Sequence, residues 1–109
     1  MMTGRPITLR SPRYRVVLGD VDEPDTWVEL EAQAITRDLQ AAETLFARHK
    51  WGKPSDQAIK LTSVAAYYAL RRTGQITGSW DEFEASYLEV SEAEVHDRVD
   101  PSLPAPDPA

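Results

Sequence analysis

The strongest pattern of hydrophobic positions lies between residues 54 and 83, where two helices separated by a sharp stop are predicted. Over residues 58–70, apolar side chains cover most of the helix circumference and leave only a narrow polar strip. An ordinary surface helix has a narrower apolar stripe. Gly74 suits the left-handed backbone that ends many helices. The pattern therefore predicts a central helix over residues 55–73 that is covered on two sides.

A second helix is predicted directly after it, over residues 79–90. Ser79 and Glu82 have the spacing of a capping box, in which each residue bonds the backbone of the other. Apolar and aromatic residues then fall at helical spacing on one face: Trp80, Phe83, Tyr87 and Val90. This face is expected to pack on one side of the central helix.

A third helix is predicted before the central one, over residues 36–50, with Thr36 as its N-cap. Its apolar residues form a one-sided stripe: Ile35, Leu39, Ala42, Leu45 and Phe46. The glycine and proline in residues 51–54 end it. This helix is expected to cover the other side of the central helix.

Alternating apolar and polar residues predict a β-hairpin within residues 7–33. Glu29 and Glu31 should pair with Arg13 and Arg15 across the strands, although exposed pairs of this kind contribute only ~0.2–1 kcal/mol. A lone hairpin is marginally stable, so it is expected to lie on the helices.

These elements predict a mainly α fold of the small α+β type, with an N-terminal β-hairpin followed by a three-helix unit. Residues 1–97 are expected to form a single domain. Residues 98–109 are acidic and proline-rich with few bulky side chains, so a disordered tail is expected there.

Composition narrows the function. The 109 residues contain no cysteine, which excludes disulfides, thiol catalysis and cysteine-based zinc sites. No apolar run reaches the length of a membrane span and no signal peptide is recognisable, so a cytosolic protein is expected. The net charge is −6, with a basic segment at 1–18 and an acidic one at 81–109. This distribution argues against broad nucleic-acid binding and fits a protein-facing role.

Candidate chemistry is weak throughout. Residues 20–31 have the acidic spacing of a calcium loop, but Pro24 occupies a ligand position and Asp25 stands where glycine is obligatory. An acidic hairpin loop is the favoured interpretation. The two histidines, His49 and His96, are far apart in the sequence. No catalytic residue, metal ligand or cofactor is predicted, and the chain is not expected to be an enzyme.

Three segments carry a family resemblance: I-T-R-D-L-Q-A-A-E-T-L-F-A-R-H-K-W-G-K-P (35–54), A-I-K-L-T-S-V-A-A-Y-Y-A-L-R-R-T-G (58–74) and S-W-D-E-F-E-A (79–85). Together they resemble the tail assembly chaperones of siphophages, in particular the actinobacterial-phage branch. Two departures stand out: Gly52 replaces a more common proline, and Tyr67-Tyr68 replaces a pair that commonly contains tryptophan.

The resemblance implies a non-enzymatic chaperone that binds the tail tape-measure protein, keeps it soluble and helps recruit tail tube subunits. It further implies a place in the host cytoplasm and absence from the mature virion. In many such phages a ribosomal frameshift gives a longer form whose added segment contacts the tail tube protein. No nucleic-acid or membrane partner is implied.

The central helix has more apolar surface than one neighbouring helix buries, so part of it is a candidate client groove. The candidate partner-binding residues are Trp51, Tyr67, Tyr68, Leu70, Arg71 and Trp80. Two alternatives stay open. The aromatic residues could simply complete a small core, and the broad apolar face could close a homo-oligomer.

Two other functions are compatible with the sequence. A small structural adaptor of the phage tail or head–tail junction would be retained in the virion. A small acidic regulator, such as an antitoxin, would wrap a basic partner encoded by a neighbouring gene. Analysis of purified virions separates the first of these from the chaperone.

Overall fold

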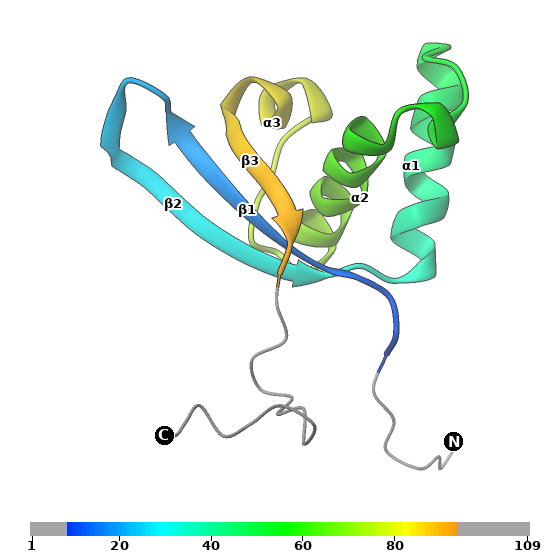
Figure 1. Ribbon diagram of the computed structural model, residues 1–109, viewed down its shortest axis with the longest axis horizontal. Helices are drawn as coiled ribbons and strands as arrows, with labels where there is room; N and C mark the ends of the chain where they lie inside the picture. The colour runs from blue at the N-terminus through cyan, green and yellow to red at the C-terminus, as the bar shows by residue number, and fades with distance from the viewer. Residues whose placement is uncertain (1–8, 94–109) are drawn as a thin grey trace, which may run out of the picture.

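The computed structural model describes residues 9–93, which form an antiparallel sheet of three strands with three α-helices on one face (Figure 1). In chain order the elements are β1 (Arg13–Asp20), β2 (Glu23–Gln33), α1 (Thr36–His49), a 3-10 turn (Pro54–Asp56), α2 (Ala58–Arg72), α3 (Trp80–Ser86) and β3 (Tyr87–Glu92). The strand order β2-β1-β3 places β1 in the centre of the sheet. The expected tail at 98–109 lies outside the described residues.

The predicted hairpin is formed by β1 and β2, and alternate residues of β1 face the helices. Tyr14 and Val16 are buried there, and Val16 lies opposite Leu30 in the register. β2 begins at Glu23, within the segment 20–31 that was expected to be an acidic hairpin loop. In Figure 1 the tip of the hairpin extends beyond the helices, so both faces of the sheet are open at that end.

The predicted charge pairs across the hairpin are confirmed. Arg13 Nε lies 2.9 Å from Glu31 Oε1, and Arg15 Nε lies 2.5 Å from Glu29 Oε2. Both pairs are diagonal, because Arg15 lies directly opposite Glu31 in the register. Long arginine side chains reach diagonal neighbours easily.

The start of α1 is fixed by a buried carboxylate, and the prediction of Thr36 as N-cap is wrong. Ile35 is the N-cap, and its backbone N–H donates to Asp38 Oδ2 at 3.0 Å. Arg72, at the end of α2, pairs with the same carboxylate at 3.1 Å and donates to the carbonyl of Gln33 at 2.7 Å. One ionic cluster therefore joins the end of β2, the start of α1 and the end of α2.

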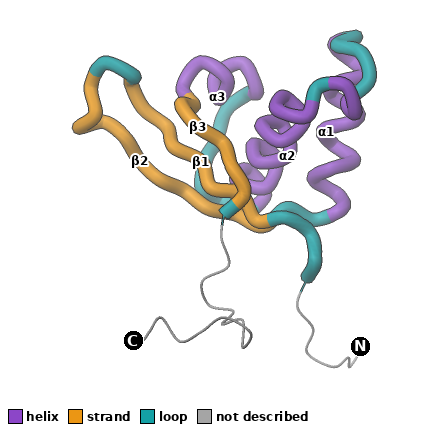
Figure 2. The backbone as a smooth tube through the Cα atoms, in the orientation of Figure 1, coloured by secondary structure: helices purple, strands orange, loops and turns teal. Residues whose placement is uncertain are grey.

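The central helix α2 is covered on two sides, by α1 and by the helix-facing side of the sheet (Figure 2). It begins at Ala58 rather than at residue 55, because Pro54–Asp56 takes up a separate 3-10 turn. Gly74 has the expected left-handed backbone, with φ at 79°. The sheet supplies most of the cover that the sequence assigned to the helix predicted at 79–90.

The expectation of a mainly α fold is wrong. Helices hold 46% and strands 29% of the described residues, which makes this a small α+β domain. The helix expected at 79–90 ends at Ser86, and Tyr87–Glu92 forms β3, antiparallel to β1. The predicted capping box at its start is confirmed: Ser79 Oγ accepts from the Glu82 N–H at 3.2 Å, and Glu82 Oε1 accepts from the Ser79 N–H at 2.9 Å.

A β-bulge explains why β3 has the apolar spacing of a helix. Val90 pairs with Val16, and Tyr87 pairs with Leu18, so β3 uses one residue more than β1 over this stretch. Leu88 is the additional residue, and both Tyr87 and Val90 pack against the core although they are three positions apart. A spacing of three is typical of a helix, whereas a regular strand would place these two side chains on opposite faces.

Candidate protein-docking surfaces

Half of the residues predicted for the client groove belong to the core. Tyr67, Leu70 and Trp80 are all buried. The ring centroids of Tyr67 and Trp80 are 5.7 Å apart, and Trp51 lies 6.1 Å from Trp80. For Tyr67, Leu70 and Trp80 the structure therefore shows a core role, which was the alternative considered above.

The buried hydroxyl of Tyr67 is fully used by neighbouring groups. It donates to the carbonyl of Gly78 at 2.8 Å and accepts from Arg71 NH1 at 3.0 Å. This explains how a tyrosine is buried beneath α3 at low cost, since both its donor and an acceptor site are satisfied. Arg71 thus supports a core tyrosine although its own side chain is exposed.

Trp51, Tyr68 and Arg71 keep part of their surface open. Trp51 stacks on His49 with centroids 4.8 Å apart, and Lys60 Nζ lies 3.8 Å from the centre of its ring. A cation over an indole face is a favourable contact. Burial raises the pKa of the Tyr68 hydroxyl above its ordinary value. Trp51 and Tyr68 border the aromatic core through Trp80 and Tyr67, respectively.

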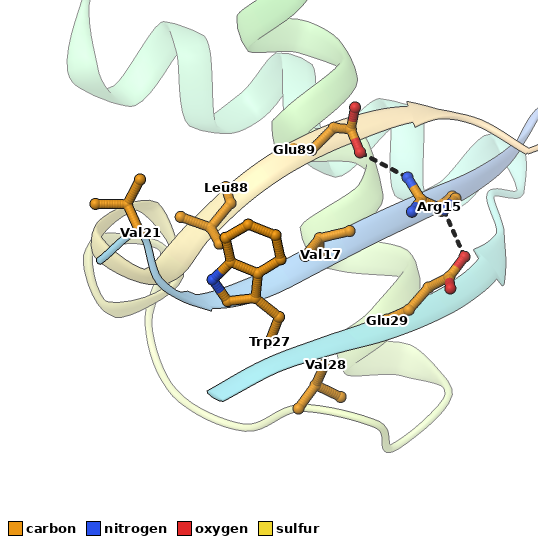
Figure 3. Close-up of a pocket in the computed structure, with 8 residues that line it drawn as sticks. All are labelled: Arg15, Val17, Val21, Trp27, Val28, Glu29, Leu88 and Glu89. Carbon is orange, nitrogen blue, oxygen red and sulfur yellow. Dashed lines mark hydrogen bonds and ion pairs between the residues drawn. The ribbon is translucent and has the colours of Figure 1, made fainter. Parts of the chain in front are cut away.

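The opposite face of the sheet carries a second surface that sequence reasoning missed (Figure 3). Val17, Trp27 and Leu88 line a shallow hollow there, with Val21 at one end. Among the described residues, three of the five exposed large hydrophobic side chains belong to the hairpin tip: Val21 at 68%, Trp27 at 47% and Val28 at 53%. We call the hollow and its lining residues the outer-face site.

Trp27 is held rigidly in this exposed position. Its Nε1 donates to the carbonyl of Asp20 at 2.7 Å. Its ring covers Gly19, where a Cβ atom would come within 2.8 Å of Trp27 Cδ1. Gly19 also has a φ of 148°, which only glycine adopts without strain. An exposed aromatic ring that is fixed in place loses little conformational entropy when a partner covers it.

Charged side chains border the outer-face site. Arg15 lies between two carboxylates, with NH1 2.6 Å from Glu89 Oε1 and Nε 2.5 Å from Glu29 Oε2. The hydrogen bonds that Arg15 donates, first to Glu89 and then to Glu29, raise its pKa. Residues 20–29 hold five acidic side chains, one of which is Glu29, and no basic one. The border of the hollow is therefore negative.

The acidic hairpin tip is a turn with local hydrogen bonds. Asp20 Oδ1 accepts from the backbone N–H of Asp22 at 2.9 Å, and Thr26 Oγ1 donates to the carbonyl of Glu23 at 2.7 Å. Within residues 9–93 no three acidic or histidine side chains are grouped so that they could hold a metal ion. The structure therefore gives no support to a calcium loop at this hairpin.

Comparison of the chain with protein families, with curated proteins and with solved structures gives no match. In the part of the chain that the structure describes, no helix combines the length and apolarity needed to cross a membrane.

Proposed function

We propose that this protein is a non-enzymatic tail assembly chaperone that binds the tail tape-measure protein and keeps it soluble. The resemblance in residues 35–54, 58–74 and 79–85 supports this proposal. Those segments build α1, α2 and α3. Most of the shared pattern thus concerns how the helices pack, and the hairpin lies outside it.

The observation that carries the proposal is the rigid, exposed apolar surface of the hairpin. A chaperone for an apolar helical client needs apolar surface that its own core does not use. The outer-face site offers this around Trp27, a residue type enriched in binding hot spots. Trp51 and Tyr68 keep part of their surface open and provide further, smaller contacts.

In this proposal the chaperone covers apolar stretches of the tape-measure protein before the tail tube forms. The net charge of −6 keeps the complex soluble by repulsion between complexes. The protein acts in the host cytoplasm, helps recruit tail tube subunits, and leaves before the virion is complete. A frameshifted longer form would bring the tail tube protein to the same complex.

Co-expression with the tape-measure protein of the same phage tests the proposal. The wild-type chain should keep that protein in the soluble fraction and co-purify with it. Trp27→Ala should reduce the co-purified amount at least about tenfold if the hairpin is the hot spot. Tyr68→Ala measures the contribution of the α2 side. Ile59→Ala is the matched control, because Ile59 is 83% exposed and lies on neither surface.

Two outcomes contradict the proposal. If the tape-measure protein is equally insoluble with and without this chain, the chaperone function fails. If the protein is instead found in stoichiometric amounts in purified virions, the structural adaptor of the tail or head–tail junction becomes the better function.

A further inference from the structure

The outer-face site combines an apolar centre with a negative border. Its centre is formed by Val17, Trp27 and Leu88, and the carboxylates of Glu29 and Glu89 lie at its side (Figure 3). We infer that this site binds a basic segment of a protein partner, in which an apolar side chain lies next to lysine or arginine. This inference rests on the proposed function only in assuming that the hairpin is a binding surface.

The charges around the site exceed what the chain itself neutralises. Among residues 9–93, Arg15 is the only basic residue that lines the hollow, and it is shared between Glu29 and Glu89. The neighbouring segment 20–29 adds Asp20, Asp22, Glu23 and Asp25 without a basic residue. A partner that brings positive charge therefore gains electrostatic attraction during approach as well as in the complex.

The apolar and the basic side chain of the partner can contact different parts of the outer-face site. An apolar side chain of the partner can fill the hollow against Val17 and Leu88, beside the edge of the Trp27 ring. A lysine or arginine next to it can lie over the exposed indole and contact Glu29 or Glu89. Cations bind indole faces well, and the fixed orientation of Trp27 means that the ring is already in place.

Self-association through the β2 edge of the sheet, next to the outer-face site, is disfavoured by charge. β2 lies at one side of the sheet and carries Glu23, Asp25, Glu29 and Glu31 without any basic residue. Pairing β2 with its own copy would bring these carboxylates together across the new interface. Such like-charge contacts oppose self-association along a sheet edge. The charge distribution therefore opposes a homodimer formed through the β2 edge, whereas it attracts a basic partner.

Binding of two short synthetic peptides tests the inference. Both have leucine at the same positions, and one carries lysine where the other carries glutamate. Titration of the full-length protein, followed by the NMR signal of the Trp27 indole N–H, should show binding of the lysine peptide only. Its affinity should fall as salt is raised, because the charges are exposed and screened.

Matched variants separate the site from the general negative charge of the protein. A double variant removes two charges at the hollow, Glu29→Gln and Glu89→Gln. It should lower the affinity for the lysine peptide at least about tenfold. Glu43→Gln with Glu84→Gln removes two exposed charges on the helices and should leave its affinity within about twofold. Trp27→Ala should abolish saturable binding.

The inference is overturned if the glutamate peptide binds equally well, or if both double variants weaken the lysine peptide equally. The co-expression experiment keeps this separate from the proposed function. A tape-measure protein that stays soluble with the Glu29→Gln, Glu89→Gln variant contradicts the basic-segment inference and leaves the chaperone intact. If the lysine peptide binds but the chain has no effect on the solubility of the tape-measure protein, the basic-segment inference stands and the chaperone function fails.

Discussion

The two faces of the sheet use tryptophan in different ways. On the helix-facing side, Trp80 is buried among the rings of Trp51, Tyr67 and Phe83. On the outer face, Trp27 is half-exposed, yet a hydrogen bond and a glycine beneath its ring hold it in place. The first arrangement stabilises the fold by burial. The second orders an aromatic ring in solvent, which contributes little burial and suits contact with another molecule.

The comparison shows that aromatic richness alone does not locate a binding surface. The segment richest in aromatic side chains supplies the core, whereas the candidate binding tryptophan lies among acidic residues on a strand. The environment of each ring distinguishes the two roles: apolar neighbours on all sides for Trp80, and charged neighbours with one open face for Trp27.

The largest expected effect concerns the helix-facing side. Leu70→Asp places a carboxylate where the side chain is fully buried, so the loss of packing and the unpaired charge should together cost more than about 4 kcal/mol. A domain of this size is stable by only ~5–15 kcal/mol, and the variant should be largely unfolded by circular dichroism. Ile59→Asp, in the same helix but exposed, should cost less than ~0.5 kcal/mol. Equal stability of both variants would contradict the assignment of this face as core.

A smaller loss is expected at the ionic cluster that joins both layers. Arg72→Ala leaves the buried Asp38 carboxylate without its ion pair and frees the carbonyl of Gln33. The loss should be about 2 kcal/mol, below the ~3–5 kcal/mol of fully buried pairs, because Arg72 is partly exposed. Arg37→Ala, an exposed arginine in α1, is the control and should cost under ~1 kcal/mol. Urea denaturation of both variants measures the difference, and equal losses would argue against the cluster.

The Gly19→Ala variant tests whether the close contact with Gly19 fixes the position of the Trp27 ring. The new Cβ would clash with Trp27 and take up an unfavourable φ, so a loss of about 1–3 kcal/mol and a shifted Trp27 indole signal are expected. Gly74→Ala also places a side chain at positive φ, but nothing lies within 4 Å of its Cβ. It should cost ~1 kcal/mol and leave Trp27 unchanged. An unchanged Trp27 signal in Gly19→Ala would remove the argument for a fixed ring.

The smallest effect is expected for the ion pairs on the outer face. Arg13→Ala removes the contact with Glu31, and because both side chains are well exposed the loss should lie within ~0.2–1 kcal/mol. Thermal denaturation at low and high salt measures it, and the difference between wild type and variant should shrink as salt is raised. A loss as large as that of Arg72→Ala would mean that this face contributes to stability as strongly as the core side.

Local sequence patterns predicted a large part of the fold. The alternation in the hairpin, the one-sided stripe of α1, the broad apolar surface of α2 and the capping box at Ser79 all correspond to features of the structure. Each depends on residues close together in the chain. β3 was missed because its bulge gives Tyr87 and Val90 a helical spacing, and because only pairing with the distant β1 makes it a strand.

The outer-face site could be predicted only in part. The pairing of Arg15 with Glu29 followed from the predicted hairpin. The contribution of Leu88 and Glu89 depends on β3, so the hollow could not be assembled without that strand. A tryptophan that alternates with acidic residues in a predicted hairpin was the available signal.

The central position of β1 has a consequence for how the chain folds during synthesis. β1 and β2 leave the ribosome first and can pair at once, but the other edge of β1 has no neighbour until residues 87–92 have emerged. Until then the nascent domain presents an unpaired strand edge and an incomplete apolar layer, both of which favour aggregation. Sheet closure over so long a stretch of chain is slow. The sheet of this domain is therefore complete only after β3 has been synthesised and has paired with β1.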